Sequence, residues 1–371
     1  MRIVLLSHRY LPNIGGIEIV VKHLAGELSR DHHVSIVAGG LPREERVSRE
    51  DGATVHRFAA LDLSDRIGIP YPVPLGPGIG GALDAIRRAD VLHVHGSLYP
   101  ASILAALLAR RRGTPLIVTE HVGFVPYRAS ALNAVQGFAW RCVGDFVAGT
   151  ASALVACGER VARWMQKRYP RSRVHLVPNG VDSERFRPLD PSERQAARAQ
   201  LGLPLERTLV LFVGRESEKK NLAPVLRIPR RDFDLVLCGA ERSIEADGVH
   251  DVGTLPYRRM PALLGCVDFL VHAGTGEGFP LVVQESLACG VPVVLLWDEG
   301  YAPVIDRKAV RACDSLEHLC EEVQSLARDR TALEDLRRGA RPYAQRRWSW
   351  SRTAAAYVDL YRQAMGVRGR A

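Results

Sequence analysis

The chain has 371 residues, of which 47% are hydrophobic and 25% charged, and its formal net charge is +9. This length predicts two domains, each large enough to bury its own core. No apolar run approaches the ~20 residues that span a membrane, so a membrane-spanning protein is not expected. Residues 1–7 are too short an apolar run for a signal peptide and are expected to form a buried strand.

The seven cysteines are scattered and form no Cys-x-x-Cys pair. An odd number without such pairs argues against a disulfide framework or a zinc site and favours a reducing compartment. We therefore expect a cytoplasmic protein.

The net charge is unevenly distributed. Residues 1–182 hold 22 Lys and Arg against 15 Asp and Glu, residues 183–345 hold 22 against 25, and residues 346–371 hold 6 against 1. The excess of basic residues in 1–182 and 346–371 predicts a face that binds anions, such as an anionic membrane surface. The alternative is that these arginines are simply solvated surface residues. Nucleic acid is not expected as a partner, because we find no recognised binding module and few aromatic residues beside the arginines.

Short apolar runs alternate with longer amphipathic segments, which predicts an α/β protein with two doubly wound, Rossmann-like units. In the first unit we expect helices at 18–29 and 101–111 and strands at 3–6, 34–38, 91–95, 116–119, 153–156 and 174–177. In the second we expect strands at 208–213, 234–238, 249–252, 268–272 and 292–296. A linker with a short exposed helix is expected at 182–205, and a last helix at 348–365.

The segment Glu277-Gly-Phe-Pro-Leu-Val-Val-Gln-Glu285 follows the strand at 268–272 and a glycine-rich loop. Pro280 suits the first position of a helix, so this helix starts at the carboxyl end of a parallel strand, where open α/β sheets bind ligands. Free N–H groups there favour anionic or hydroxylated ligands. Glu277 and Glu285 could accept hydrogen bonds from a donor sugar and a ribose. The alternative is a solvated loop carboxylate and a surface residue of the helix.

Two other loops follow strand ends. Arg215 and Lys220 come after the strand at 208–213, and together they suit a diphosphate whose developing charge they could neutralise without a metal. Gly15 and Gly16 follow the first strand and would let a phosphate or sugar approach the backbone closely. The alternative for Arg215 and Lys220 is that they are surface charges paired with neighbouring glutamates. The alternative for Gly15 and Gly16 is an ordinary turn.

Three histidines lie near expected strand ends. His121 falls at a carboxyl end, where it could donate a hydrogen bond to a donor sugar. His93 and His95 flank a buried strand position and are expected to be packed, hydrogen-bonded core residues. No histidine pair has a plausible third ligand, so no metal site is expected.

Taken together, these stretches resemble the retaining glycosyltransferases of the GT-B fold known as glycosyltransferase family 4 or group 1. Each motif is weak alone, but the ordered set is specific and covers nearly the whole chain. The matching pieces are Gly15-Gly16-Ile-Glu18, His93-Val-His95-Gly96, Thr119-Glu-His121, Pro178-Asn-Gly-Val-Asp182, Gly214-Arg215 with Lys220, Gly253, Glu277 to Glu285, Ala288-Cys-Gly290-Val-Pro292 and Trp348-Ser-Trp350-Ser.

The resemblance implies an acceptor-binding domain at 1–182, a nucleotide-sugar donor domain at 183–345, a cleft between them, and a last helix at 346–371 that crosses back. It implies that His121, Glu277, Arg215 and Lys220 are catalytic. The donor contacts that it implies are Gly15, Gly16, Arg215, Lys220, Glu277, Gly278, Phe279, Pro280, Leu281 and Glu285. The acceptor would attack the face that the leaving group departs from, with the β-phosphate as base.

The implied function is retaining, metal-independent transfer from a nucleotide-diphosphate sugar, a UDP- or GDP-sugar, to a hydroxyl of a glycan, glycolipid or small metabolite. It would take place in the cytoplasm or peripherally on the inner face of the membrane. Glu241, Pro280 and the loop at 297–301 depart from glycines that the family usually has, and they leave the donor open. The alternatives are an enzyme like UDP-N-acetylglucosamine 2-epimerase, which has the same fold, and a non-catalytic sugar-nucleotide-binding subunit.

Overall fold

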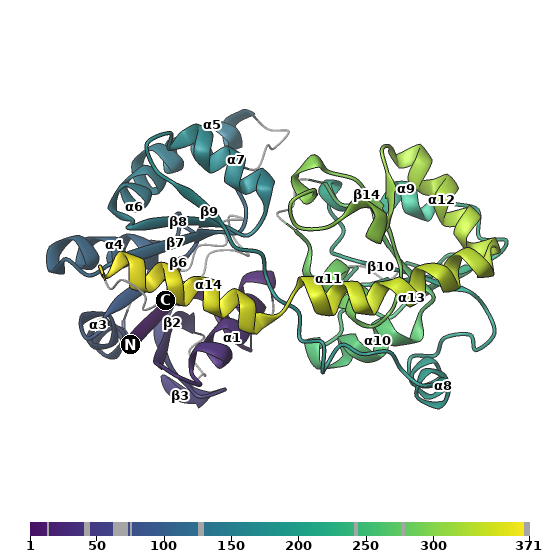
Figure 1. Cartoon of the computed structure of the whole chain (residues 1–371), viewed down its shortest axis with the longest axis horizontal. Helices are drawn as coiled ribbons and strands as arrows, with labels where there is room; N and C mark the ends of the chain where they lie inside the picture. The colour runs from purple at the N-terminus through teal and green to yellow at the C-terminus, as the bar shows by residue number, and fades with distance from the viewer. Residues whose placement is uncertain are drawn as a thin grey trace. The chain divides into compact units, whose positions relative to one another are not determined.

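The computed structural model describes residues 1–12, 15–40, 45–61, 73–74, 76–124, 130–240, 244–275 and 279–366. The chain divides into two compact α/β units, which Figure 1 shows. The first unit consists of Met1–Pro178 with Trp350–Ala371, and the second of Asn179–Ser349. Each unit is built on its own sheet, and each has its own hydrophobic core on both faces of that sheet.

The sheet of the first unit has the order β3-β4-β2-β1-β6-β7-β8-β9, with β5 paired to β4. Every neighbouring pair from β4 to β9 along this order is parallel. The strands are β1 (Arg2–Arg9), β2 (His33–Gly40), β3 (Val47–Glu50), β4 (Ala53–Leu61), β5 (Val73–Pro74), β6 (Val91–His95), β7 (Leu116–Glu120), β8 (Ala153–Ala156) and β9 (Val174–Leu176).

Strands β3, β4 and β5 were not predicted, and β3 and β5 pair antiparallel with β4. Strands β3 and β4 form a hairpin, because the chain makes a tight turn between them at Asp51 and Gly52, whose φ angles of 48° and 85° are both left-handed. Two such residues in succession match the twist of a β-hairpin, and Asp-Gly is a strong sequence signal for it. This signal could have revealed the hairpin.

Helices cover both faces of this sheet because successive strand residues point to opposite sides. On one face, Ile3 and Ile117 pack with Leu24 of α1 and Tyr357 of α14. On the other face, Val4 packs in a core to which α3, α4, α6 and α7 contribute. The helical segments are α1 (Gly16–Leu28), α3 (Ile79–Arg87), α4 (Pro100–Arg112), α5 (Ser130–Ala139), the π-helical turn η1 (Trp140–Gly144), α6 (Asp145–Thr150), α7 (Glu159–Arg168) and α14 (Trp350–Ala364).

Helix α14, yellow in Figure 1, is joined to the first unit by polar contacts as well as by its apolar face. The Tyr361 hydroxyl lies 2.7 Å from Nδ1 of His93, and the Tyr357 hydroxyl lies 3.0 Å from Oγ1 of Thr119. The Thr353 hydroxyl donates to the carbonyl oxygen of Pro178. These contacts bring the last helix back onto the middle strands of the first sheet.

The sheet of the second unit has the order β12-β11-β10-β13-β14-β15, and all its pairs are parallel. Its strands are β10 (Leu209–Val213), β11 (Asp234–Cys238), β12 (Val249–Asp251), β13 (Phe269–His272), β14 (Val293–Leu296) and β15 (Arg311–Cys313). Strand β15 was not predicted, and it is a short edge strand whose Arg311 is exposed.

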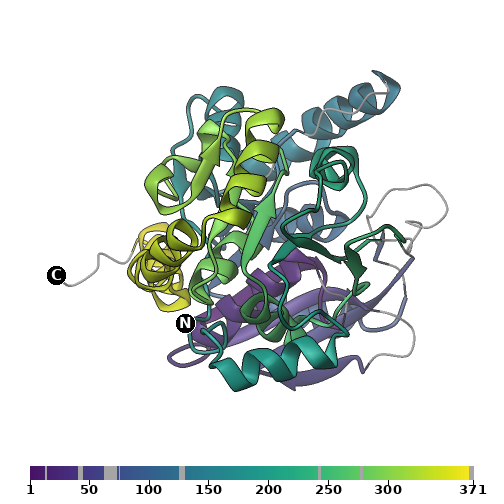
Figure 2. The ribbon, with the colours of Figure 1, turned by 90° about the vertical axis from the view of Figure 1, so that its right-hand side faces the viewer.

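Helices again cover both faces. Helices α10, α11 and α13 contribute to the core of one face, and α9 and α12 to that of the other. Helix α8 lies beside α10 at the outside of the unit (Figures 1 and 2). The helical segments are α8 (Pro191–Gln200), η2 (Glu218–Lys220), α9 (Leu222–Leu226), η3 (Tyr257–Arg259), α10 (Met260–Cys266), α11 (Leu281–Ala288), η4 (Glu299–Tyr301), η5 (Arg307–Ala309), α12 (Leu316–Arg328) and α13 (Arg330–Arg347).

Three arginines converge on Asp268, directly before β13. Arg194 and Arg198 come from α8 and Arg337 from α13, with nitrogens 2.6, 2.8 and 2.9 Å from the carboxylate oxygens of Asp268. The carboxylate also accepts a hydrogen bond from the backbone N–H of Leu209. This mostly buried cluster ties two helices to the amino edge of the sheet, opposite the edge where ligands are expected.

Candidate active site

In both units those predicted site residues that the structure describes lie at or beyond the carboxyl ends of the strands, near the point where the strand order reverses. In the second unit this point lies between β10 and β13, because the chain continues from β10 to β11 on one side and returns to β13 on the other. In the first unit it lies between β1 and β6. Open α/β sheets bind ligands at such points.

The loop after β10 carries the predicted cations. Arg215 is exposed, and Lys220 ends the 3-10 turn η2. A Cβ atom on Gly214 would lie 3.1 Å from Cδ and 3.2 Å from Cε of Lys220. The aliphatic stem of Lys220 therefore lies directly over the Gly214 backbone, and glycine leaves the space for it.

Two hydrogen bonds join this loop to the loop after β13. The N–H of Thr275 donates to the carbonyl oxygen of Lys219 at 2.9 Å, and Nδ2 of Asn221 donates to the carbonyl oxygen of Ala273 at 2.8 Å. The Lys220 turn and the start of the glycine-rich loop are thus one connected structure. Glu277 and Gly278 follow in sequence but lie outside the described residues.

Helix α11 begins one residue later than predicted. Pro280 is its N-cap rather than its first residue, Leu281 is the first, and no side chain caps the first turn. The ring of Phe279 is buried and contacts Tyr301 and Trp348 at centroid distances of 5.5 and 5.6 Å. Because the ring is held in the core, only the backbone groups of Phe279 could contact a ligand.

Glu285 is buried in α11, so the alternative of a surface residue was wrong. Its Oε1 accepts a hydrogen bond from the Tyr257 hydroxyl at 2.8 Å. Burial raises the pKa of the Glu285 carboxyl to about 7, against the opposing effects of this hydrogen bond and of Arg185. The guanidinium of Arg185 lies over the ring of Tyr257 at 5.1 Å. Sequence reasoning missed Tyr257, because no local pattern links it to a glutamate 28 residues away.

In the first unit, Gly15 is the N-cap of α1 and Gly16 its first residue. A Cβ atom on Gly15 would lie 2.5 Å from Oε2 of Glu18, so only glycine lets this carboxylate fold back over the helix start. Apart from its chain neighbours and the backbone of its own helix, no described residue has an atom within 4 Å of the position that a Cβ of Gly16 would take. Glu18 is itself buried, with Oε1 3.5 Å from Nε2 of His8.

His93 and His95 lie on one face of β6, and His121 directly follows the adjacent strand β7. His93 contacts the Tyr361 hydroxyl through Nδ1 and the Thr119 hydroxyl through Nε2, which confirms it as a packed, hydrogen-bonded core residue. Nδ1 of His95 lies 3.0 Å from Nε2 of His121. Burial, and to a lesser degree His8, lowers the pKa of His121 to about 4, so the ring is neutral at neutral pH.

Glu120 is a buried carboxyl at the same strand end that the sequence analysis did not single out. Its Oε1 accepts hydrogen bonds from both the backbone N–H and the hydroxyl of Ser97. Burial raises its pKa from 4.5 to about 7, although the Ser97 bonds oppose this. A folded-state pKa above the unfolded value means that the folded chain binds the proton more tightly, so stability is lost as pH rises towards 7.

Glu120→Gln is therefore expected to stabilise the protein at pH 8 and to have little effect at pH 5. The amide oxygen can still accept from Ser97, and the cost of ionising a buried carboxyl disappears. The gain at pH 8 is expected to be ~1–3 kcal/mol, since one pKa unit corresponds to about 1.4 kcal/mol. Denaturant unfolding of both chains across this pH range measures it. Parallel pH profiles of the two chains would contradict this account.

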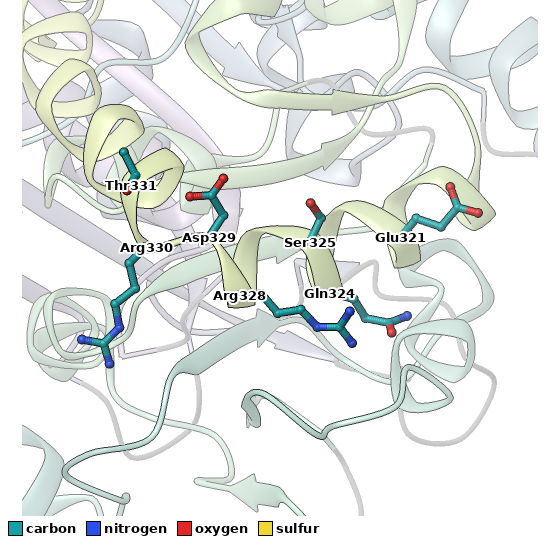
Figure 3. A pocket seen from close by; sticks show the side chains of 7 residues that line it. All are labelled: Glu321, Gln324, Ser325, Arg328, Asp329, Arg330 and Thr331. Carbon is teal, nitrogen blue, oxygen red and sulfur yellow. The ribbon is translucent and has the colours of Figure 1, made fainter.

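A wide depression of about 780 Å³ lies where α12 meets α13 (Figure 3). Helix α12 runs back from the carboxyl end of β15, so its last turn lies at the amino edge of the sheet, away from Lys220 and Glu285. The depression therefore does not belong to the candidate site. It is lined by Glu321, Gln324, Ser325, Arg328, Asp329, Arg330 and Thr331.

Two family descriptions match the chain: Glycosyltransferase Family 4 over residues 14–185 and Glycosyl transferases group 1 over residues 193–346. A D-inositol 3-phosphate glycosyltransferase of Xylanimonas cellulosilytica is 32% identical over 306 residues, which cover 74% of this chain and 72% of the relative. The chain belongs to the group 1 glycosyltransferases of family 4. This family membership favours a glycosyltransferase over the two alternatives, an epimerase of the same fold and a non-catalytic binding subunit.

This glycosyltransferase is also similar over nearly its whole length to a GDP-mannose:cellobiosyl-diphosphopolyprenol alpha-mannosyltransferase of Xanthomonas oryzae. The two are 24% identical over 403 residues, which cover 99% of this chain and 98% of the relative. Among solved structures, a sucrose-phosphate synthase of Thermosynechococcus elongatus has a TM-score of 0.77 at 20% identity, covering 99% of both chains. Anabaena HepE in complex with UDP and glucose has a TM-score of 0.72 at 18% identity, covering 97% of this chain and 98% of that one. These likenesses identify the GT-B fold.

Within the described part of the glycosyltransferase, no helix is long and apolar enough to cross a membrane. The same residues contain no group of three or more His, Cys, Asp or Glu side chains that could hold a metal ion.

Proposed function

We propose that this glycosyltransferase transfers a sugar from a nucleoside diphosphate sugar to a hydroxyl acceptor, with retention of configuration and without a metal ion. The observation that carries the proposal is the connected structure after β10 and β13, in which Thr275 and Asn221 tie the Lys220 turn to the glycine-rich loop. A cation for a diphosphate and backbone groups for a sugar are thereby held within one rigid assembly.

The second unit supplies groups for each part of such a donor. Lys220 and Arg215 neutralise the charge that develops on the departing diphosphate, which is the role that a metal ion plays in other transferases. Glu285, oriented by Tyr257, accepts hydrogen bonds from the ribose. The free N–H groups at the start of α11 meet sugar hydroxyls. The family resemblance adds Glu277 at the sugar.

The first unit binds the acceptor and adds Gly16 at the diphosphate and His121 at the sugar, as the resemblance implies. In this scheme the acceptor hydroxyl attacks the face from which the diphosphate departs. Its proton passes to an oxygen of the β-phosphate as the bond between the sugar and the diphosphate breaks. No protein base is then needed, which agrees with a His121 that donates a hydrogen bond.

The names of the similar proteins suggest which donors to test first. Several relatives are named for GDP-mannose, and the HepE structures contain UDP or UDP-glucose. A panel of UDP-, GDP-, ADP- and TDP-sugars can be screened by thermal stabilisation, because a ligand that binds the folded state raises its melting temperature. We expect a UDP- or GDP-sugar to raise it most, and a chain stabilised by none of the panel would count against the proposal.

Transfer is expected to survive excess EDTA, because lysine and arginine take the place of a metal at the diphosphate. The rate of product formation is measured in buffer with and without chelator, using the donor that the panel identifies. Equal rates are the expected result. A rate that falls with EDTA and returns with magnesium or manganese would show that the diphosphate is held by a metal.

We propose further that the first unit contacts an anionic membrane surface through α5. This helix carries no charged residue, and its Val135 and Phe138 are 60% and 69% exposed. Helix α5 lies at the edge of the unit, close to α7 (Figure 1). The ring of Trp140, the residue that directly follows α5, contacts the ring of Trp164 on α7, with a centroid distance of 4.5 Å. An uncharged helix that exposes apolar side chains beside a basic helix suits the boundary of a lipid headgroup layer.

The flanking charge comes from exposed basic residues. On α7 these are Arg160, Arg163 and Lys167, while Arg141 follows α5. Arg163 and Arg168 contribute less, because Glu159 accepts a hydrogen bond from Arg163 and Asp145 accepts two from Arg168. Each basic residue near an anionic leaflet contributes about 1 kcal/mol, so a handful suffices for reversible attachment.

The paired change Val135→Ser and Phe138→Ser is expected to weaken binding to anionic vesicles several-fold without reducing stability, because both side chains are exposed. Co-sedimentation with vesicles of graded anionic lipid content, at low and high salt, measures the binding. Leu205→Ser is a matched control, since Leu205 is 51% exposed in the second unit. No binding at low salt, or equal binding to neutral and anionic vesicles, would remove the membrane proposal.

A further inference from the structure

His95 and His121 share one hydrogen bond between two ring nitrogens. Nδ1 of His95 lies 3.0 Å from Nε2 of His121, and the two rings are nearly parallel, with centroids 5.3 Å apart. His95 is completely buried, and burial lowers the pKa of both histidines, so both rings are neutral at neutral pH. A neutral imidazole carries one N–H and one bare nitrogen, so one ring must donate and the other accept.

The second nitrogen of His95 decides which ring donates. Nε2 of His95 is buried and has no hydrogen-bond partner within the described part of the chain. A buried N–H group without an acceptor is rarer in proteins than an acceptor left unfilled. Nε2 of His95 is therefore the bare nitrogen, and the single proton of this ring lies on Nδ1. This N–H donates to Nε2 of His121.

It follows that Nε2 of His121 carries no proton and that the proton of its ring lies on Nδ1. The neighbouring His93 exerts no such control, because both its nitrogens already contact hydroxyl groups of Tyr361 and Thr119. Hydroxyl groups can donate or accept, so they do not fix a tautomer.

We propose that His95 is a positioning residue that holds His121 in the Nδ1–H form, so that His121 offers the donor sugar a hydrogen-bond donor and not an acceptor. The tautomer follows from the contacts of the first unit alone, whereas the sugar as its target rests on the proposed function. His95 itself touches neither substrate and acts through His121.

The tautomer can be read directly by long-range proton–nitrogen NMR of the full chain labelled with ¹⁵N-histidine, with signals assigned by single substitution. The expected result at neutral pH is a protonated Nδ1 and a bare Nε2 in both His95 and His121. A protonated Nε2 on His121, or an imidazolium at either position, would overturn the proposal. This readout needs no donor or acceptor, so it stands even if the proposed function fails.

Two substitutions of His95 separate positioning from packing. In His95→Asn the amide N–H₂ group lies near the place of Nδ1–H and can still donate to His121, whereas His95→Phe keeps a ring but cannot donate. We expect the Phe variant to lose the single tautomer of His121 and to lower kcat/KM by about 5- to 10-fold, the effect of one hydrogen bond. The Asn variant should keep the tautomer and lose less activity.

His93→Phe is the matched control, because it removes buried hydrogen bonds on the same strand without touching His121. It is expected to lower the melting temperature and to leave the His121 tautomer unchanged. If the Asn and Phe variants of His95 behave alike, or if the Phe variant keeps the wild-type tautomer and activity, then His95 has only a packing role. If neither variant folds, the wild-type spectrum still decides the tautomer.

Discussion

Lys220→Ala is expected to lower the rate of sugar transfer by roughly 10- to 100-fold or more, because a charge-assisted contact to a phosphate contributes about 1.5–3 kcal/mol. The ammonium group is held in place by its own stem, which lies over Gly214. The loss should appear in kcat more than in donor KM if the charge acts mainly on the departing diphosphate. Steady-state kinetics with the identified donor measure both parameters.

Two companion variants make this result interpretable. Lys219→Ala removes an equal charge from the same half-buried turn. It is expected to change kcat by no more than about 3-fold, because we assign the diphosphate contact to Lys220, and a partly solvated charge without such a contact contributes little. Lys220→Arg should recover part of the rate, since it restores the charge but not its position. Normal kinetics in Lys220→Ala would show that the diphosphate lies elsewhere.

Asp268→Ala is expected to lower the free energy of unfolding of the second unit by ~3–5 kcal/mol, the cost of removing one partner from a buried ion pair. The change leaves Arg194, Arg198 and Arg337 facing one another without a carboxylate, and Leu209 loses the acceptor of its N–H. Denaturant unfolding monitored by tryptophan fluorescence measures the loss.

Asp232→Ala serves as the control for this prediction. Asp232 pairs with Arg328 at 2.6 Å, but both side chains are exposed. Pairs of this kind contribute only ~0–1 kcal/mol, so the control should unfold almost as the wild type does. If the two variants lose equal stability, the ion pairs around Asp268 do not stabilise the second unit more than an exposed pair does.

The middle of each sheet could be predicted from sequence because its strands are buried on both faces. Strands such as β1 and β6 are short runs of Val, Ile and Leu between turn residues, and the structure has them within a few residues of the predicted bounds. Strand β4 was missed because Arg57 interrupts its apolar run. Arg57 is buried and is paired with Glu50 and with the carbonyl oxygen of Leu11. Such compensation by distant partners leaves no local pattern.

The candidate site was predictable to a similar extent. Motif spacing placed Lys220 and Glu285 after strand ends, and the structure has both at the carboxyl edge of the second sheet. Their supporting partners could not be predicted, because Tyr257 and Glu285 are joined only by the fold, as are His95 and His121. Sequence patterns identify groups that meet a ligand more readily than the groups that hold them in position.

The return of α14 to the first unit has a consequence for the order in which the protein can mature during synthesis. Residues 1–178 leave the ribosome first, but Tyr357 and Tyr361, which complete one face of their core, are made only after the whole second unit. At ~5–20 residues per second this delay is roughly 10–35 s. During that time the apolar face of α1 and the ring of His93 lack their native cover. A nascent first unit is thus a natural client for holding chaperones, and synthesis of α14, rather than emergence of residues 1–178, sets the moment when the core of the first unit can be completed.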